Sequence, residues 1–198
     1  MVDARSPASG MLGGMKHLDL AVLEAGLDEI RRSPRDEGRL ALIVRRPAVE
    51  QRETLTEATL DTEEGLVGDC WRARGSSGTA DGSANPKAQL TLTNARAVAL
   101  VAQRDDRWQL AGDQLYVDLD LSGGNVPPGT RLAVGSAVVE ISDQPHRGCR
   151  KFLDRFGKDA LKFVNSEVGR ELNLRGVNAM VVVGGIVRAG DAVRKLPA

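Results

Sequence analysis

The segment Asp143–Gly157, DQPHRGCRKFLDRFG, holds the side chains best suited to chemistry. After Cys149, Phe152 and Phe156 recur at helical spacing, and Gly157 ends that helix. We therefore expect Cys149 in or just before the first helical turn. At such a position the unpaired N–H groups and the positive end of the helix dipole favour a thiolate over a thiol.

Basic side chains surround this cysteine and favour the same ionised form. They are His146, Arg147, Arg150 and Lys151. A thiolate attacks sulfur or coordinates a soft metal, whereas a free cysteine without such surroundings is most often a small buried hydrophobe. We predict Cys149 as the reactive residue and His146 as its catalytic companion.

Other cysteine and nucleotide chemistries fit the sequence poorly. Cys70, Cys149, His146 and His17 lack the close paired spacings of zinc modules. A cysteine hydrolase would need a base and an orienting group, and His146 lies only three residues before Cys149 on a turning backbone. No Walker loop or Rossmann glycine fingerprint is present. Cys70, in GDCWRAR, has no comparable helix start, so a structural role is expected for it.

The composition is that of one soluble globular domain. The chain has 198 residues, of which 41% are hydrophobic and 27% charged. Lys and Arg number 27, as do Asp and Glu, so neither nucleic acid nor an anionic membrane is expected as a partner. With two cysteines and no signal-peptide pattern, the sequence predicts a cytoplasmic protein with reduced thiols.

The elements that must position Cys149 form two parts. An amphipathic helix is expected at about 17–32, where Leu20, Leu23, Leu27 and Ile30 recur at helical spacing. It would lie in an N-terminal extension, residues 1–39, docked on a domain of residues 40–198.

Short strands dominate that domain and predict a mostly β (α+β) fold. Alternating residues at 114–121 place Leu115 and Val117 on one face and Tyr116, Asp118 and Asp120 on the other, where we expect Asp118 and Asp120 to be solvent-exposed. Hairpins are expected at 131–134 with 137–141, around Gly135-Ser136, and at 179–183 with 186–188, around Gly184-Gly185. Further strands are expected at 40–45 and 192–196, and helices at 94–103 and from Cys149 to about Leu172 with a break at Gly157. A closed or nearly closed barrel would hide so many strand edges.

Five motifs in this order resemble the MOSC family, named from the C-terminal domain of molybdenum cofactor sulfurases. The resemblance covers about residues 40–196. The motifs are EGLVGDCWRAR (64–74), QLTLTN (89–94), the stretch 112–141 with Asn125 and a Pro-Pro-Gly turn, PHRGCRKF (145–152) and GGIVRAGDAVRKL (184–196). Within that family the chain resembles the small stand-alone bacterial type.

The resemblance implies a MOSC-type β-barrel with a few peripheral helices and Cys149 at the mouth of a pocket. In members that carry molybdenum cofactor the matching cysteine binds the metal, and in the sulfurase picture it carries a persulfide. Residues expected to hold a molybdopterin are Arg72, Arg74, Thr93, Asn94, Asn125 and Arg150. The helix start at Thr93-Asn94 would suit its phosphate.

Three functions follow from the resemblance. One is a molybdenum-dependent oxidoreductase that reduces N-hydroxylated compounds with electrons from an electron-transfer protein. The second is a sulfur carrier loaded by a separate cysteine desulfurase, and the third is a cofactor-binding module without turnover. Pyridoxal phosphate belongs to the desulfurase part of full sulfurases and is not expected in this chain. The small-molecule substrate and the oligomeric state stay open.

Overall fold

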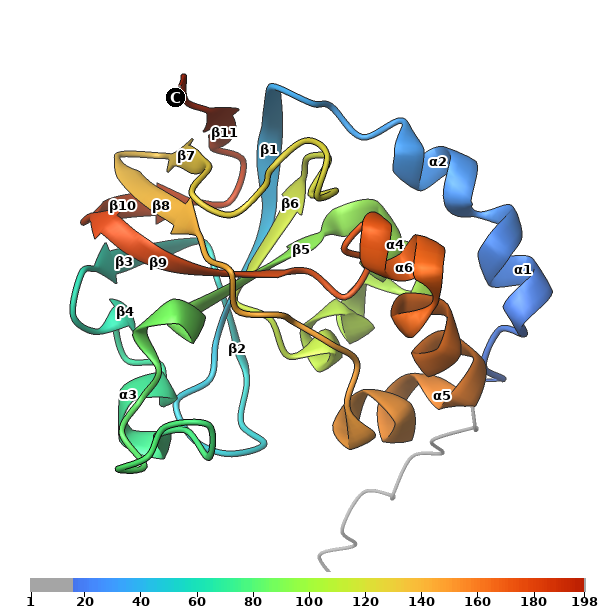
Figure 1. Ribbon diagram of the computed structural model, residues 1–198, viewed down its shortest axis with the longest axis horizontal. Helices are drawn as coiled ribbons and strands as arrows, with labels where there is room; N and C mark the ends of the chain where they lie inside the picture. Colours follow the sequence, from blue (N-terminus) through green and yellow to red (C-terminus); the bar gives the residue numbers. More distant parts are fainter. Residues whose placement is uncertain (1–15, 198) are drawn as a thin grey trace, which may run out of the picture.

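A seven-stranded β-barrel forms the body of the protein (Figure 1). The structure is a computed structural model and describes residues 16–197. The strand order is β11-β7-β8-β9-β5-β6-β1, and pairing of β11 with β1 closes the barrel. The strands are β1 (Glu37–Arg45), β5 (Leu90–Asn94), β6 (Leu115–Asp118), β7 (Arg131–Val134), β8 (Ala137–Ile141), β9 (Val177–Val183) and β11 (Ala192–Lys195). All neighbours are antiparallel except β5 and β6. The predicted mostly β barrel is confirmed.

A second, three-stranded sheet lies beside the barrel and includes one strand that was predicted in a different pairing. It contains β10 (Gly185–Arg188), β3 (Glu57–Asp61) and β4 (Gly65–Leu66), while β2 (Glu53–Leu55) extends β1. The hairpin expected around Gly184-Gly185 is wrong, because β9 pairs with β8 and β5 whereas β10 pairs with β3. The chain changes sheets at these glycines. A side chain at Gly185 would collide with the backbone of Ser136 at 2.6 Å.

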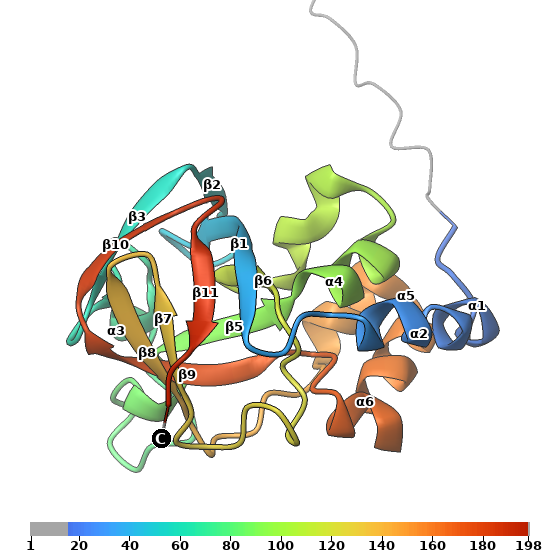
Figure 2. The ribbon, with the colours of Figure 1, turned by 90° about the horizontal axis from the view of Figure 1, so that it is seen from above.

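Helices gather on one side of the barrel in both views (Figures 1 and 2). They are α1 (Leu20–Ala25), α2 (Leu27–Arg31), α4 (Ala95–Ala102), α5 (Arg150–Asn165), α6 (Glu167–Glu171) and the 3-10 helix η2 (Asp105–Ala111). Two short elements, α3 (Trp71–Arg74) and the 3-10 helix η1 (Pro86–Ala88), lie outside this layer. No helix within residues 16–197 combines the length and apolar character needed to cross a bilayer.

The helix expected at 17–32 is present but divided. Gly26 ends α1, its N–H bonding to the carbonyls of Leu23 and Glu24, and also precedes α2. A Cβ at this position would lie 2.5 Å from Leu100 Cδ2 in α4, so a glycine permits the close approach of the two elements.

Two hydrophobic cores hold these layers together. The barrel interior takes the face of β6 that carries Leu115 and Val117, as the alternation predicted. The opposite face is not wholly solvated: Tyr116 is fully buried under the helical layer, and its hydroxyl donates to the Trp108 carbonyl at 2.9 Å. Asp118, expected at the surface, is partly covered and pairs with Arg96 of α4 at 2.7 Å.

Candidate functional site

A pocket of about 310 Å³ opens between the end of the barrel, the segment joining β1 to β2, and the start of α5. Both cysteines and His146 line it. Six cationic side chains line it as well: Arg46, Arg52, Arg74, Lys151, Arg155 and Arg175. Glu50 is the one carboxylate among the described lining residues. Three carboxylates, Glu50, Asp69 and Asp113, pair with five of these cations, so the pocket wall keeps an excess of positive charge.

Cys149 is the N-cap residue of α5, as its sequence predicted. Its side chain makes no capping hydrogen bond, and the residue is exposed. The backbone before it is fixed, because Gly148 N donates to Asn165 Oδ1 at 3.0 Å and Asn165 Nδ2 donates to the Gly148 carbonyl at 3.2 Å. The thiol is thus accessible on a held backbone.

His146 lies deep in the pocket wall. Its side chain is 16% exposed, and Nδ1 lies 3.6 Å from Oδ1 of the fully buried Asp113. Burial lowers the pKa of His146 well below its ordinary value, and the positive charges of Arg175 and Arg46 lower it further. Both effects favour the neutral imidazole.

A buried ion pair supports this wall. Arg175 Nη1 donates to Asp113 Oδ2 at 2.6 Å, and Nη2 donates to the Ala111 carbonyl at 2.8 Å. The guanidinium also lies over the Phe152 ring, 5.1 Å from its centroid. Burial raises the pKa of Asp113, and the adjacent Arg175 opposes that shift.

A second buried ion pair gives a structural role to Asp69 of the Gly68-Asp69-Cys70 sequence. Asp69 accepts two hydrogen bonds of 2.9 Å from the guanidinium of Arg46 and one of 2.9 Å from its backbone N–H. The N–H of Cys70 donates to the Arg46 carbonyl at 2.7 Å. These contacts fix Arg46 and Cys70 together in the pocket wall, and since Asp69 has a fully buried side chain its role is to hold them.

The outer rim joins the β1–β2 segment to α5. Glu50 adopts a left-handed backbone conformation, with φ of 64°, and accepts from Lys151 Nζ at 2.7 Å and from Arg155 Nη2 at 2.6 Å. Hydrogen bonds from Lys151 and Arg155 lower the pKa of Glu50 to about 2. Beside it, Arg52 Nε is buried and has no hydrogen-bond partner among the described residues.

The structure brings together three of the predicted site residues and separates five. Cys149, His146 and Arg74 line the pocket, whereas the other five lie outside it: Arg72, Thr93, Asn94, Asn125 and Arg150. Arg72 is exposed and pairs with Glu63 at 3.6 Å, and the largely exposed Arg150 pairs with Asp154 at 2.9 Å.

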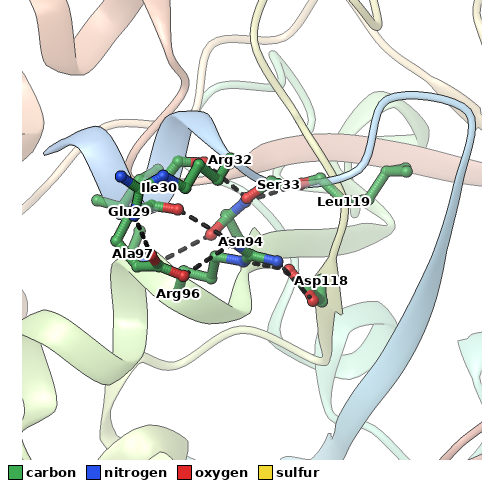
Figure 3. Close-up of polar contacts among 9 residues, drawn as sticks. All are labelled: Glu29, Ile30, Arg32, Ser33, Asn94, Arg96, Ala97, Asp118 and Leu119. Atoms are coloured by element: carbon green, nitrogen blue, oxygen red, sulfur yellow. Dashed lines mark hydrogen bonds and ion pairs between the residues drawn. The ribbon is translucent and has the colours of Figure 1, made fainter.

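The phosphate site expected at Thr93-Asn94 is not available (Figure 3). Asn94 caps α4 by accepting from Ala97 N at 3.0 Å, and its amide donates to Ser33 Oγ and to the Leu119 carbonyl, both at 2.8 Å. Thr93 and Asn94 are both buried. The expectation failed because the segment carrying Ser33 covers this helix start and the protein's own groups use it.

Asn125, too, is occupied by structural contacts. Its amide donates to the carbonyls of Arg35 and Asp120 at 2.8 Å each, and its oxygen accepts from Lys195 Nζ at 2.9 Å. It ties the segment before β1 and the end of β11 to the loop after β6.

Sequence reasoning missed the buried pairs of the pocket wall. Arg46, Asp69, Asp113 and Arg175 come from four separate segments, so no local spacing links them. One signal was available: both aspartates directly follow a glycine, in Gly68-Asp69 and Gly112-Asp113.

The donor set fits an anion better than a caged metal ion. Within residues 16–197, no three His, Cys, Asp or Glu side chains come together as metal ligands. Two buried guanidinium nitrogens, Arg52 Nε and Arg175 Nε, have no protein acceptor in that part of the chain. Both nitrogens are also inaccessible to solvent, so the cationic groups open to a pocket ligand are those nearer the surface, Arg74 and Lys151.

Comparisons with known proteins agree with this fold. A sequence comparison with curated proteins gives no match. Among solved structures, the YuaD protein from Bacillus subtilis is similar with a TM-score of 0.59 and 13% identity, over 79% of this chain and 94% of that one. YiiM from Escherichia coli is similar with a TM-score of 0.53 and 20% identity, over 81% of this chain and 70% of that one. YiiM from Geobacillus stearothermophilus gives 0.54 and 14%, over 81% and 75%.

A family model identifies the chain directly. The MOSC domain model matches residues 79–194, which is more than half of the sequence and includes β5 through most of β11, α5 and Cys149. The chain belongs to the MOSC domain family.

Proposed function

We propose that the pocket around Cys149 binds molybdenum cofactor, with the Cys149 thiolate as a ligand of the metal. The observation that carries this proposal is one exposed thiol beside six cationic side chains in a single pocket. Molybdopterin is anionic through its phosphate. The thiol would therefore suit the metal of the cofactor, and the cationic side chains would suit its phosphate. The MOSC family supplies the association with molybdenum.

The pocket's size and its surface cations support the fit. Its volume of about 310 Å³ lies at the lower end of small-molecule sites, roughly 300–1,000 Å³. Arg74 and Lys151, nearer the surface, would add attraction before contact.

Each residue of the pocket would have a distinct role in a reductase. Cys149 would bind the metal from a backbone that Asn165 holds. His146, being neutral, could accept a hydrogen bond or a proton at a ring nitrogen beside a substrate. When bound, the cofactor would supply two-electron chemistry for reducing an N-hydroxylated compound, with electrons from a separate electron-transfer protein.

The exposure of Cys149 also favours sulfur carriage as a second candidate. A persulfide on this residue would be within reach of a cysteine desulfurase and of an acceptor protein. In that case the cationic pocket would stabilise the anionic persulfide rather than a phosphate.

Metal content of purified protein separates these functions. The protein would be produced in a host that makes molybdenum cofactor, and molybdenum and pterin would be measured per chain. We expect near-stoichiometric values for the wild type and for Cys70→Ala, the control that removes the other thiol of the same pocket, and loss in Cys149→Ala. Because Cys149 is exposed and makes no side-chain hydrogen bond, its loss should leave the melting temperature nearly unchanged.

Absence of molybdenum from all three proteins would overturn the proposal. Persulfide labelling at Cys149 after incubation with a desulfurase and cysteine would then test the sulfur carrier. Bound cofactor without turnover of hydroxylamine compounds would indicate a binding module.

A further inference from the structure

Two buried polar atoms face each other in the pocket wall without any other partner. They are Nδ1 of His146 and Oδ1 of Asp113, separated by 3.6 Å. Neither has a hydrogen-bond partner among the described residues, and both are inaccessible to solvent. The second carboxylate oxygen, Oδ2, is held by Arg175 at 2.6 Å, and Oδ1 is the oxygen that faces His146.

The protonation of the ring decides whether this contact is favourable. With a bare Nδ1, two lone pairs would face each other in a buried site, and both atoms would stay unsatisfied. A doubly protonated ring is disfavoured by burial and by the nearby guanidiniums of Arg175 and Arg46. With Asp113 ionised by its ion pair with Arg175, a neutral ring with its proton on Nδ1 is the form that satisfies both atoms, after a small shift to hydrogen-bond distance.

We propose that Asp113 is a positioning residue that holds His146 as the neutral imidazole protonated on Nδ1, so that Nε2 presents a hydrogen-bond acceptor to the pocket. The recognition of a ligand by Nε2 rests on the proposed function, whereas the position of the ring proton does not. In a pocket otherwise rich in N–H donors, the acceptor selects a ligand that carries an N–H or O–H group beside its anionic part. The hydroxyl of an N-hydroxylated compound is such a group.

Arg175 orients the Asp113 carboxylate toward His146. Arg175 fixes Asp113 from one side and also bonds to the Ala111 carbonyl. Its guanidinium therefore sets the direction of the carboxylate that His146 meets.

The tautomer can be read directly by nitrogen-15 NMR of the tag-free protein without cofactor. The chain has two histidines, His17 and His146, so a His17→Gln variant assigns the ring signals. For the wild type at pH 7 we expect His146 to show a protonated Nδ1 and an unprotonated Nε2. The opposite tautomer, or a protonated ring, would overturn the proposal.

The variant Asp113→Asn adds a readout that a purely structural role would not change. Its side-chain amide can donate to Nδ1, so the ring proton should move to Nε2 wholly or in part. An unchanged tautomer in a folded Asp113→Asn protein would contradict the proposal. If this variant does not fold, the wild-type spectrum alone still decides. Since no cofactor is needed, failure here is distinct from failure of molybdenum binding.

Discussion

Cys149 is reachable from solvent, while the backbone that carries it is fixed by Asn165 and by the close packing of Gly148. That combination suits a metal ligand, which must meet its partner without a large change of position. The local sequence predicted this residue and His146 because a helix start, a glycine and basic neighbours all lie within a few positions. The pairing of Asp113 with Arg175 could not be predicted from local sequence, because 62 residues separate them along the chain.

Gly148 provides a test of this fixed backbone. A Cβ there would lie 2.7 Å from Leu161 Cδ1 and 3.0 Å from Val164 Cγ2, both on α5. Gly148→Ala should therefore destabilise the protein by about 1 kcal/mol, the lower end of the range for overpacking, because the Leu161 methyl can turn away while the buried Val164 leaves little room. It should also weaken cofactor retention. Urea unfolding would measure the first effect and molybdenum content the second.

Gly123 gives a matched control for that substitution. Its nearest contact for an added Cβ is the Glu171 carbonyl at 4.0 Å, so Gly123→Ala should change the free energy of unfolding far less. Equal effects of the two substitutions would show that packing at Gly148 is not special.

At the scale of elements, α5 connects the cysteine to the rest of the pocket. The helix begins after Cys149, bends at Gly157 where φ is 89°, and carries Lys151 and Arg155 one turn apart. Both side chains bind Glu50 from the segment between β1 and β2, so this segment is attached to the helix by ion pairs. The helix, its start and its break could be predicted from spacing and glycine, but its partner across the pocket could not.

Glu50 should make stability depend on acid pH. Its pKa is about 2 in the folded protein, below the ordinary value of 4.5, because Lys151 and Arg155 stabilise the carboxylate. A lowered folded pKa contributes stability above the unfolded pKa, and this contribution is lost as pH falls toward 2. The wild type should therefore be more stable than Glu50→Gln at pH 7, with the difference disappearing between about pH 4.5 and 2.

Urea unfolding over a pH series would measure this difference. Glu63→Gln is a suitable control, because Glu63 and its partner Arg72 are both largely exposed and lie 3.6 Å apart. A difference between wild type and Glu50→Gln that stays constant from pH 7 to 2 would contradict the role of these ion pairs.

Over the whole molecule, alternation and turn residues predicted a β-barrel, and the closed seven-stranded barrel confirms it. The hairpin at Gly184-Gly185 was wrong because a glycine pair also permits a strand to leave one sheet for another. The phosphate site at Asn94 was wrong because the segment before β1 packs over that helix start. Each of these outcomes depends on contacts between distant segments, which local patterns do not contain.

The same long-range assembly produces the cationic pocket. The sequence has no net charge, yet six basic side chains from different segments line one site. The overall charge balance therefore gave no indication of a local cluster of basic side chains.

Alkylation of the two cysteines tests the central proposal most directly, that the Cys149 sulfur binds the molybdenum of the cofactor. Iodoacetamide labelling would be compared by peptide mass spectrometry between cofactor-loaded and cofactor-free wild-type protein, with Cys70 as the internal reference. We predict that Cys149 is labelled in the cofactor-free protein and protected in the loaded one, with a much smaller change at Cys70. Equal labelling of Cys149 in both forms of a protein that contains stoichiometric molybdenum would contradict its role as a metal ligand.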